Sequence, residues 1–359
     1  MEAVLLALLL MGGSYGFLLM GRRKYLVSAE NANPNLPKLS IIIPARNEEN
    51  NLKKLFASLD RQALGSFPVE VIVVDDQSTD RTAEVAYSWG AEVITNSDLP
   101  GGWTGKTFAL HNGAQHATGE CFLFVDADVE FEPGAIPSFY SQFVQTTNLE
   151  AHAILPYHQI EKPYECLSVF FNLLMAMGTD AFLLGGAEKE KLVGQVLLIR
   201  KESYWNAGGH QGVSGEVLEN FFLSKKLEQV NVKCRTFFGK GIVRFRMFPD
   251  GMAQLIEGWK KAFARGASEV TRVTLIKSII WITALMTTIV LMPLMPAVAW
   301  KLYLFFTIQM LILQSRVGRY FWWSAFLWPV TLIFYQYVYF SAIAAKRSGV
   351  KATWRGREL

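Results

Sequence analysis

The sequence predicts an α/β domain held at a membrane by helices near both ends of the chain, and three observations support this. Five short apolar segments alternate with amphipathic segments between residues 39 and 200, the pattern of a parallel or mixed sheet covered by helices on both faces. Of the 359 residues, 51% are hydrophobic, and the long apolar runs gather at the two ends. A net charge of +4 is too small to indicate a nucleic-acid-binding protein.

The first element is an apolar run, Val4 to Met20, which is followed directly by Gly21-Arg22-Arg23-Lys24. A secretory signal carries its positive charge before the apolar run. The order found here therefore predicts a retained membrane anchor, residues 1–24, whose carboxyl end faces the cytoplasm. A short linker with Pro34 and Pro37 follows.

From residue 39 onward, predicted strands and helices alternate in a domain expected to span residues 38–248. Strands are expected at 39–44, 70–75, 92–95, 121–126 and 196–200, and helices at 47–62, 79–89, 104–117 and 133–145. Because ligands of open α/β sheets bind beyond the carboxyl ends of the strands, the loops that follow these strands form the expected site.

The strand at 121–126 ends in Asp126-Ala127-Asp128, two carboxylates separated by one small residue. Such a pair needs a counter-cation, and hard oxygen ligands suit Mg²⁺ or Mn²⁺. An ion of this kind takes one or two carboxylates and completes its shell with water and phosphate oxygens, so the pattern predicts a diphosphate ligand. For an isolated Asp-x-Asp, an acidic turn is the simpler interpretation, and the neighbouring loops must decide.

Three loops at the same predicted edge carry groups suited to a nucleotide. Residues 44–48, Pro-Ala-Arg-Asn-Glu, follow the first strand, and the amides and Arg46 there are suited to a phosphate or a base. Asp75 and Asp76 end the second strand, where a carboxylate can hold a ribose hydroxyl or a base N–H. Residues 101–106, Gly-Gly-Trp-Thr-Gly-Lys, permit close backbone approach and supply a cation, although they lack P-loop spacing.

Taken together, residues 41–49, 73–82, 105–113 and 126–128 resemble the ordered motifs of glycosyltransferase family 2, the inverting enzymes of GT-A fold that use nucleotide-diphosphate sugars. The resemblance covers about residues 38–227. It implies a nucleotide pocket lined by Pro44, Ala45, Arg46 and Glu48, with Asp76 on the uridine and Lys106 on the diphosphate. It also implies that Asp126 and Asp128 bind Mg²⁺ or Mn²⁺, with Asp128 the closer and catalytic ligand.

The same resemblance places a catalytic base at the start of a later helix, commonly as Glu-Asp, and only residues 215–221 fit. Glu219 is then the base, although Asn220 stands where Asp is usual, and a solvated helix residue is the simpler interpretation. His210 follows a glycine pair that lets the backbone pass under a sugar or diphosphate. We expect His210 to complete the metal shell or to touch the acceptor, with an ordinary polar contact as the alternative. Trp259 is expected to stack on the acceptor, or else to be an interfacial aromatic.

The carboxyl-terminal part predicts membrane contact. Residues 225–277 hold 12 Lys or Arg against 4 Asp or Glu, and residues 249–273 are expected to form a basic interfacial segment on the cytoplasmic leaflet. Three apolar stretches follow within 274–345, before a basic cytoplasmic tail at 346–359. Three full crossings would leave one basic cluster outside, so one of the stretches is expected to be interfacial or re-entrant, and Pro329 makes the last stretch a candidate. The apolar run at 167–184 is expected to give a lipid acceptor a place to lie.

Within the family, the chain resembles members that transfer glucose from UDP-glucose to the carboxylate of a carotenoid acid, which gives a glucosyl ester. This implies a multi-pass membrane enzyme with a cytoplasmic catalytic domain, which acts on a UDP-sugar and a lipid or carotenoid acceptor among membrane lipids. Transfer to a lipid hydroxyl of hopanoid, ceramide or diacylglycerol type stays open. So does a protein that binds a nucleotide sugar without catalysis, although a binder would need no base such as Glu219.

Overall fold

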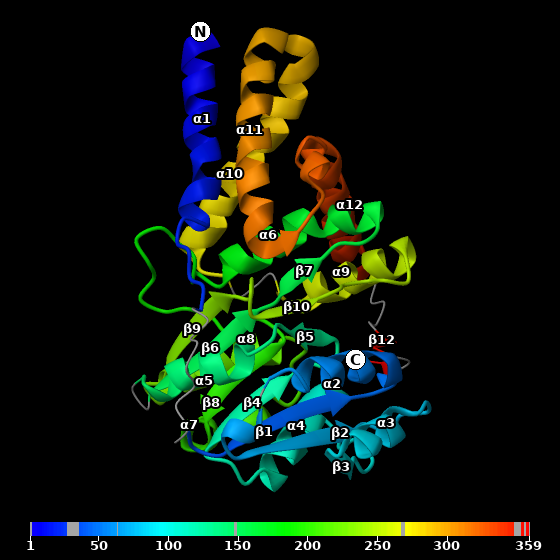
Figure 1. The fold of residues 1–359 in the computed structure, drawn as a ribbon. Helices are drawn as coiled ribbons and strands as arrows, with labels where there is room; N and C mark the ends of the chain where they lie inside the picture. The colour runs from blue at the N-terminus through cyan, green and yellow to red at the C-terminus, as the bar shows by residue number, and fades with distance from the viewer. Residues whose placement is uncertain are drawn as a thin grey trace. The chain divides into compact units, whose positions relative to one another are not determined.

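The computed structural model describes residues 2–26, 36–62, 64–146, 149–266, 270–347, 353–354 and 357–358. The chain divides into two compact units (Figure 1). The sheet unit comprises Lys24–Tyr157 and Lys189–Arg246, and the helical unit comprises Met1–Arg23, His158–Glu188 and Met247–Leu359. Residues 158–188 therefore cluster with the helices near the chain ends, although the sequence placed them inside the domain from 38 to 248.

A seven-stranded mixed sheet forms the centre of the sheet unit. Its strands, in the spatial order β3-β2-β1-β4-β8-β6-β9, are Glu92–Thr95, Val69–Asp75, Leu39–Ala45, Cys121–Val125, Val196–Arg200, Glu150–Leu155 and Lys233–Phe238. The first four run parallel, β8 is antiparallel to both β4 and β6, and β6 is parallel to β9. The predicted mixed, mainly parallel sheet is confirmed.

Helices and two short strands complete the sheet unit. They are α2 (Glu49–Leu59), η1 (Leu64–Ser66), α3 (Thr82–Trp89), α4 (Gly105–His116), α5 (Ala135–Val144), α7 (Lys201–Asn206), η3 (Gly209–Val213) and α8 (Glu219–Gln229), with β5 (Val129–Phe131) paired to β10 (Val243–Phe245). The predicted strands and helices agree with β1 to β4, β8 and α2 to α5 within a few residues. β6 was not predicted, because its sequence, Glu-Ala-His-Ala-Ile-Leu, lacks a run of β-branched or aromatic residues.

The order of the strands creates a switch point beside β1. The chain passes from β1 to β2 and β3 on one side, and then returns to place β4 on the other side of β1. Connections leave in opposite directions at such a point, which opens a crevice at the carboxyl ends of the strands. The loops after β1, β2 and β4 therefore meet at this edge.

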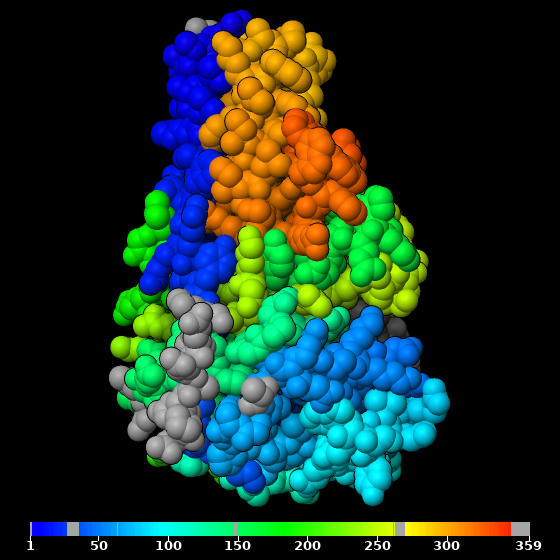
Figure 2. All heavy atoms as spheres, viewed as in Figure 1, coloured from blue at the N-terminus to red at the C-terminus, as the bar shows by residue number. Residues whose placement is uncertain are grey.

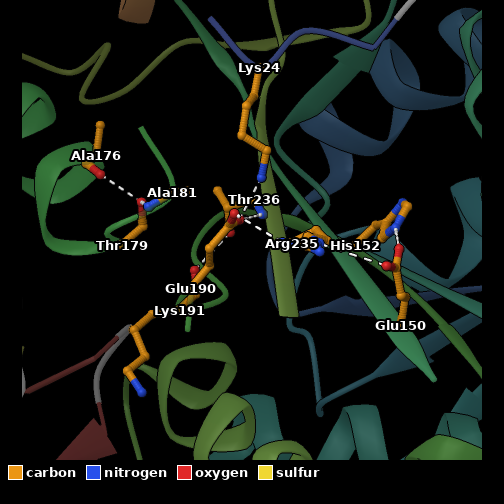
Figure 3. A network of polar contacts seen from close by, with 10 residues as sticks. All are labelled: Lys24, Glu150, His152, Ala176, Thr179, Ala181, Glu190, Lys191, Arg235 and Thr236. Atoms are coloured by element: carbon orange, nitrogen blue, oxygen red, sulfur yellow. Dashed lines mark hydrogen bonds and ion pairs between the residues drawn. The ribbon is translucent and has the colours of Figure 1, made fainter. Parts of the chain in front are cut away.

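A buried ion network fixes the segment that follows the first helix to β9 (Figure 3). The Lys24 Nζ lies 2.5 Å from a carboxylate oxygen of Glu190, whose side chain is fully buried, and the same oxygen accepts the Thr236 backbone N–H at 3.0 Å. Arg235 lies 3.4 Å from Glu190 and 3.7 Å from Glu150. Lys24, which the sequence suggested as a charge that orients the anchor, is thus also part of the folded sheet unit.

The helical unit contains the long apolar helices. Its elements are α1 (Glu2–Leu19), η2 (Pro163–Ser168), α6 (Val169–Gly178), α9 (Met252–Gly266), α10 (Arg272–Leu294), α11 (Pro296–Val317), η4 (Trp322–Ala325) and α12 (Trp328–Arg347), with β11 (Gly318–Arg319) paired to β7 (Tyr157–Gln159) and β12 (Thr353–Trp354) to β13 (Arg357–Glu358). Within the described residues, α1, α10 and α11 are long and apolar enough to cross a membrane. The last apolar stretch becomes η4 and α12, and its interfacial or re-entrant placement stays a prediction. Most of the expected tail at 346–359 lies outside the described residues.

Glycines of α1 allow close packing against α10 and α11, and Figure 2 shows the blue atoms of α1 directly against the orange atoms of α11. A Cβ atom on Gly13 would lie 2.7 Å from the Phe306 ring, and one on Gly16 would lie 2.6 Å from Trp281 Nε1. The Gln309 amide donates to the Gly13 carbonyl at 2.9 Å and accepts from the Trp281 indole at 2.7 Å. The first helix is therefore an integral part of the helical unit.

Candidate functional site

The predicted nucleotide-binding loops meet at the switch point of the sheet unit. The Asp76 backbone N–H donates to the Ala45 carbonyl at 2.8 Å, which joins the ends of β2 and β1. The Asp126 N–H, just beyond β4, donates to the Gln195 carbonyl at 2.9 Å. The structure thus brings the first, second and fourth motifs to one edge of the sheet, as expected.

Lys106, which is expected to bind the diphosphate, lies in one cluster with Asp126 and with Glu219, the expected catalytic base. Its Nζ lies 2.8 Å from one oxygen of Asp126, 2.9 Å from the other, and 2.7 Å from Glu219 Oε1. Burial alone would lower the pKa of Lys106, but the two carboxylates raise it above its ordinary value. The lysine therefore stays charged, and it is the cation available to an incoming anion.

Asp126 lies among like charges. Burial is the main reason that its pKa rises to about 7, and Asp128 and Glu219 raise it further against the opposing effect of Lys106. Asp128 itself is exposed in the turn between β4 and β5. A cation bound at Asp126 and Asp128 would relieve this repulsion.

Two loops hold Lys106 and Glu219 against each other. Thr104 caps α4 in a reciprocal capping box with Thr107, which places Lys106 in the first turn of the helix. The Thr104 N–H donates to the Ser214 carbonyl at 2.8 Å, and the Thr107 hydroxyl donates to the same oxygen. Because the loop containing Ser214 leads into α8, these bonds fix Glu219 relative to Lys106.

Glu219 is the first residue of α8 and is buried. A carboxylate is favourable at this end of a helix, because the free backbone N–H groups carry partial positive charge. The next residue, Asn220, donates its amide to the Gly194 carbonyl at 2.9 Å. A carboxylate cannot donate that bond, so the departure from Glu-Asp serves the attachment of α8 to the loop before β8.

The nucleoside side of the site is organised around Asp76, which is buried. The Arg46 guanidinium donates to the Asp76 carbonyl at 2.6 Å and lies 3.6 Å from its carboxylate. Of the other predicted pocket residues, Pro44 and Ala45 end β1, and Glu48 accepts the Asn51 amide at 2.6 Å at the start of α2. Their contacts with a nucleotide stay predictions.

His210 is fully buried in η3, where its imidazole meets the edge of Phe124. The Tyr204 hydroxyl lies 2.9 Å from its Nδ1 and accepts its backbone N–H at 3.0 Å. Burial lowers the pKa of His210 to about 3, helped by the nearby charge of Lys106. Tyr204 contacts Nδ1, and the predicted roles of His210 toward a metal or an acceptor stay predictions.

Trp259 lies in α9 of the helical unit, where it is 4% exposed. Its ring stacks on Phe171 at 4.5 Å, and its indole N–H donates to Ser168 Oγ at 3.1 Å. These contacts account for the residue without an acceptor. Its expected stacking on an acceptor stays a prediction that the buried position does not favour.

The donor set suits a divalent cation bound partly by substrate. Within the described ranges, no group of three or more His, Cys, Asp or Glu side chains is arranged to hold a metal. The carboxylates of Asp126 and Asp128 fit an ion that takes its remaining ligands from phosphate and water. The observation that favours such an ion is this donor set, two carboxylates separated by one residue at the end of β4.

Comparison with known proteins gives consistent results. The model of glycosyl transferase family 2 matches residues 40–167. A protein named 4,4'-diaponeurosporenoate glycosyltransferase from Staphylococcus haemolyticus is 36% identical over 75% of this chain and 73% of its own length. A protein of the same name from Staphylococcus aureus is 31% identical over 100% of this chain and 97% of its own length.

One solved structure resembles this chain in fold. A mannosyltransferase from Pyrobaculum calidifontis, determined with GDP-mannose and Mn²⁺, aligns with 98% of this chain and 99% of its own at a TM-score of 0.59. The two sequences are 16% identical, so this likeness concerns the fold alone.

Proposed function

Because the chain belongs to glycosyl transferase family 2 and has the GT-A fold that its sequence predicts, we propose that it transfers glucose from UDP-glucose to the carboxylate of a carotenoid acid. The relatives that cover the chain bear the name of such an acceptor. The observation that carries the proposal is the contact of Lys106 with both Asp126 and Glu219 at the switch point, where a cation for the diphosphate stands beside two acidic groups.

Each group has a role that follows from its position. Asp76 and Arg46 bind the nucleoside, and Lys106 binds the diphosphate. Asp126 and Asp128 hold Mg²⁺ or Mn²⁺, which when bound supplies Lewis-acid stabilisation of the charge on the leaving group. All these groups lie at the carboxyl ends of β1, β2 and β4 or at the start of α4.

The transfer is a single displacement that inverts the sugar. One oxygen of the acceptor carboxylate forms a bond to the anomeric carbon while the bond from that carbon to the diphosphate oxygen breaks. UDP leaves with the bonding electron pair. A carboxylic acid with a reference pKa of about 4 is already ionised at neutral pH, so the acceptor gives up no proton in this step.

Attachment to a membrane would place the enzyme at the bilayer in which an apolar acceptor dissolves. The helices α1, α10 and α11 are the candidate spans among the described residues. Gly21-Arg22-Arg23-Lys24 after α1 favours a cytoplasmic catalytic domain by the positive-inside tendency. Protease accessibility of the sheet unit in right-side-out and inverted vesicles tests this orientation. Cleavage only in inverted vesicles is expected, and cleavage only in right-side-out vesicles would reverse the topology.

The proposed activity is tested by UDP release from the detergent-purified protein. The assay contains UDP-glucose, Mn²⁺ or Mg²⁺, and either an apocarotenoid acid or its alcohol analogue, with Asp128→Ala as the control. Turnover of the acid alone, lost in the control, is the expected result. Turnover of the alcohol alone would assign the protein to transferases of lipid hydroxyls. Tight UDP-glucose binding without turnover of either lipid would favour a non-catalytic binder.

A further inference from the structure

A row of hydrogen bonds connects α4 with the predicted uridine contact. Asn112, in the second turn of α4, donates its amide to Asn96 Oδ1 at 2.8 Å. Asn96 lies just after β3, is buried, and donates its own amide to Asp76 Oδ1 at 3.2 Å. The Asn96 backbone N–H donates to the Asp75 carbonyl at 2.9 Å, which fixes the residue at the end of β2.

The charge of the Asp76 carboxylate decides which group donates and which accepts in each hydrogen bond of this row. An ionised carboxylate only accepts hydrogen bonds, so Asn96 must turn its NH₂ group toward Asp76. The Asn96 oxygen then faces α4, and Asn112 must donate to it. Reversing either amide would bring oxygen against oxygen or NH₂ against NH₂, so each member holds the next in a single orientation.

We propose that Asn96 and Asn112 are positioning residues, which hold the carboxylate of Asp76 in the orientation that reads uracil. This rests on the proposed function, because it takes the ligand to be a uridine nucleotide. The readable edge of uracil offers an N–H between two carbonyl oxygens. Asp76 supplies an acceptor for that N–H, and Arg46, 3.6 Å from the same carboxylate, supplies a donor.

The row of hydrogen bonds also links recognition of the uracil base to binding of the diphosphate. Asn112 and Lys106 belong to the same helix, so α4 sets the spacing between Asp76 and the lysine that faces the diphosphate. A nucleotide that fits both points must have a base and a diphosphate at the matching separation. The two asparagines would therefore contribute to selection of the base without touching it.

The test measures binding rather than turnover. Affinities for UDP, CDP and inorganic diphosphate are measured with Mn²⁺ on the detergent-purified full chain and on Asn96→Ala, Asn96→Asp and Asn112→Leu. Loss of the Asn96 hydrogen bond to the charged Asp76 carboxylate is expected to weaken UDP binding by on the order of tenfold or more, and Asn112→Leu, which removes a bond between two neutral amides, should weaken it less. CDP presents a ring acceptor where UDP presents the N–H, so its affinity should change less, and diphosphate affinity should stay within about twofold.

The matched control is Gln115→Ala, which removes an exposed amide from the same helix. It should leave all three affinities unchanged. If the asparagine variants weaken UDP and inorganic diphosphate equally, they act through general disorder of the site and the proposal is overturned. If UDP affinity is unchanged in Asn96→Ala, the proposal is also overturned.

A double variant distinguishes positioning from folding. Asn96→Asp places a carboxylate against Asp76 and should weaken UDP binding most. Adding Asp76→Asn restores the row, because residue 76 then donates and residue 96 accepts from both sides. Partial recovery of UDP affinity relative to Asn96→Asp alone is expected, and a further loss would contradict the row. Failure of the unmodified protein to bind UDP at all would instead overturn the proposed donor.

Discussion

The Nζ of Lys106 lies 2.7 Å from Oε1 of Glu219, so the residue expected to be the catalytic base is ion-paired with the residue expected to bind the diphosphate. The same ammonium contacts Asp126. A bound diphosphate would supply a further anionic partner for Lys106, and a metal ion would take up the charge of Asp126. Binding of the nucleotide sugar would therefore change the charges that surround Glu219.

Replacement of this lysine tests the central contact. Lys106→Met removes the cation that faces the leaving group, and turnover is expected to fall by about 10² to 10³, the scale found for loss of one preorganised charge-stabilising group. The measurement is the rate of UDP release at saturating donor. Lys53→Met, which removes an exposed lysine of α2, is the control that should retain activity. A Lys106→Met rate within tenfold of the unmodified protein would contradict the assigned role.

The effect of replacing Glu219 on the rate distinguishes a carboxylate acceptor from a hydroxyl acceptor. Glu219→Gln keeps the shape of the side chain but removes its capacity to take a proton. With a carboxylate acceptor the loss should be small. With a hydroxyl acceptor it should be on the order of 10² to 10⁴. Rates with the acid and with the alcohol are compared, and Glu228→Gln on the same helix serves as the control. A large loss with the acid would assign Glu219 a further role in positioning.

The ion pair of the partly buried Lys24 with the fully buried Glu190 predicts an effect on stability outside the site. Glu190→Gln removes the negative charge that lies 2.5 Å from the Lys24 ammonium, and about 3 to 5 kcal/mol of stability should be lost. Lys24→Met leaves Arg235, 3.4 Å from Glu190, as the remaining cation at that carboxylate, so it should cost less than Glu190→Gln. The double variant should cost less than the sum of the two, as measured by unfolding in detergent. Additive losses would show that the two charges do not stabilise each other.

The packing of α1 predicts that alanine substitutions at two of its glycines, one helical turn apart, affect stability differently. Gly16→Ala places a methyl group 2.6 Å from Trp281 Nε1, whereas Gly12→Ala finds its nearest side-chain atom at 3.4 Å. Overpacking costs about 1 to 3 kcal/mol, which should exceed the gain in helix propensity of about 1 kcal/mol. The unfolding temperature of the detergent-solubilised protein should therefore fall for Gly16→Ala and rise slightly for Gly12→Ala. Equal behaviour of the two would argue against close packing of the first helix.

The buried imidazole of His210 predicts a pH dependence of stability. Its pKa falls from 6.5 to about 3 in the folded protein, so between these values the unfolded chain binds a proton that the folded chain does not. Stability is then lost as the pH falls below about 6.5, by about 1.4 kcal/mol per pH unit from this group. His210→Gln lacks this contribution, so its unfolding temperature should decrease less between pH 6.5 and pH 5. His116→Gln, at an exposed position, should follow the unmodified protein.

Several elements were predictable because local sequence and solvent exposure decide them. The strands β1, β2 and β4 are apolar runs followed by polar turns, and buried parallel strands have this pattern wherever they occur. The capping residue Thr104 and the glycines before it mark the start of α4 in the same local way. The three candidate spans follow from length and composition alone.

The sequence by itself therefore determined the α/β domain, its family, the apolar helices and the types of residue at the site. Only the tertiary structure decided that Lys106 pairs with Glu219, that Asn112 reaches Asp76 through Asn96, and that Lys24 is held by Glu190. The partners in these contacts are separated by between 16 and 166 residues. Hydrophobic patterning and capping act over a few neighbours, whereas such pairings depend on which strands lie side by side, and strand order is set by packing of the whole sheet.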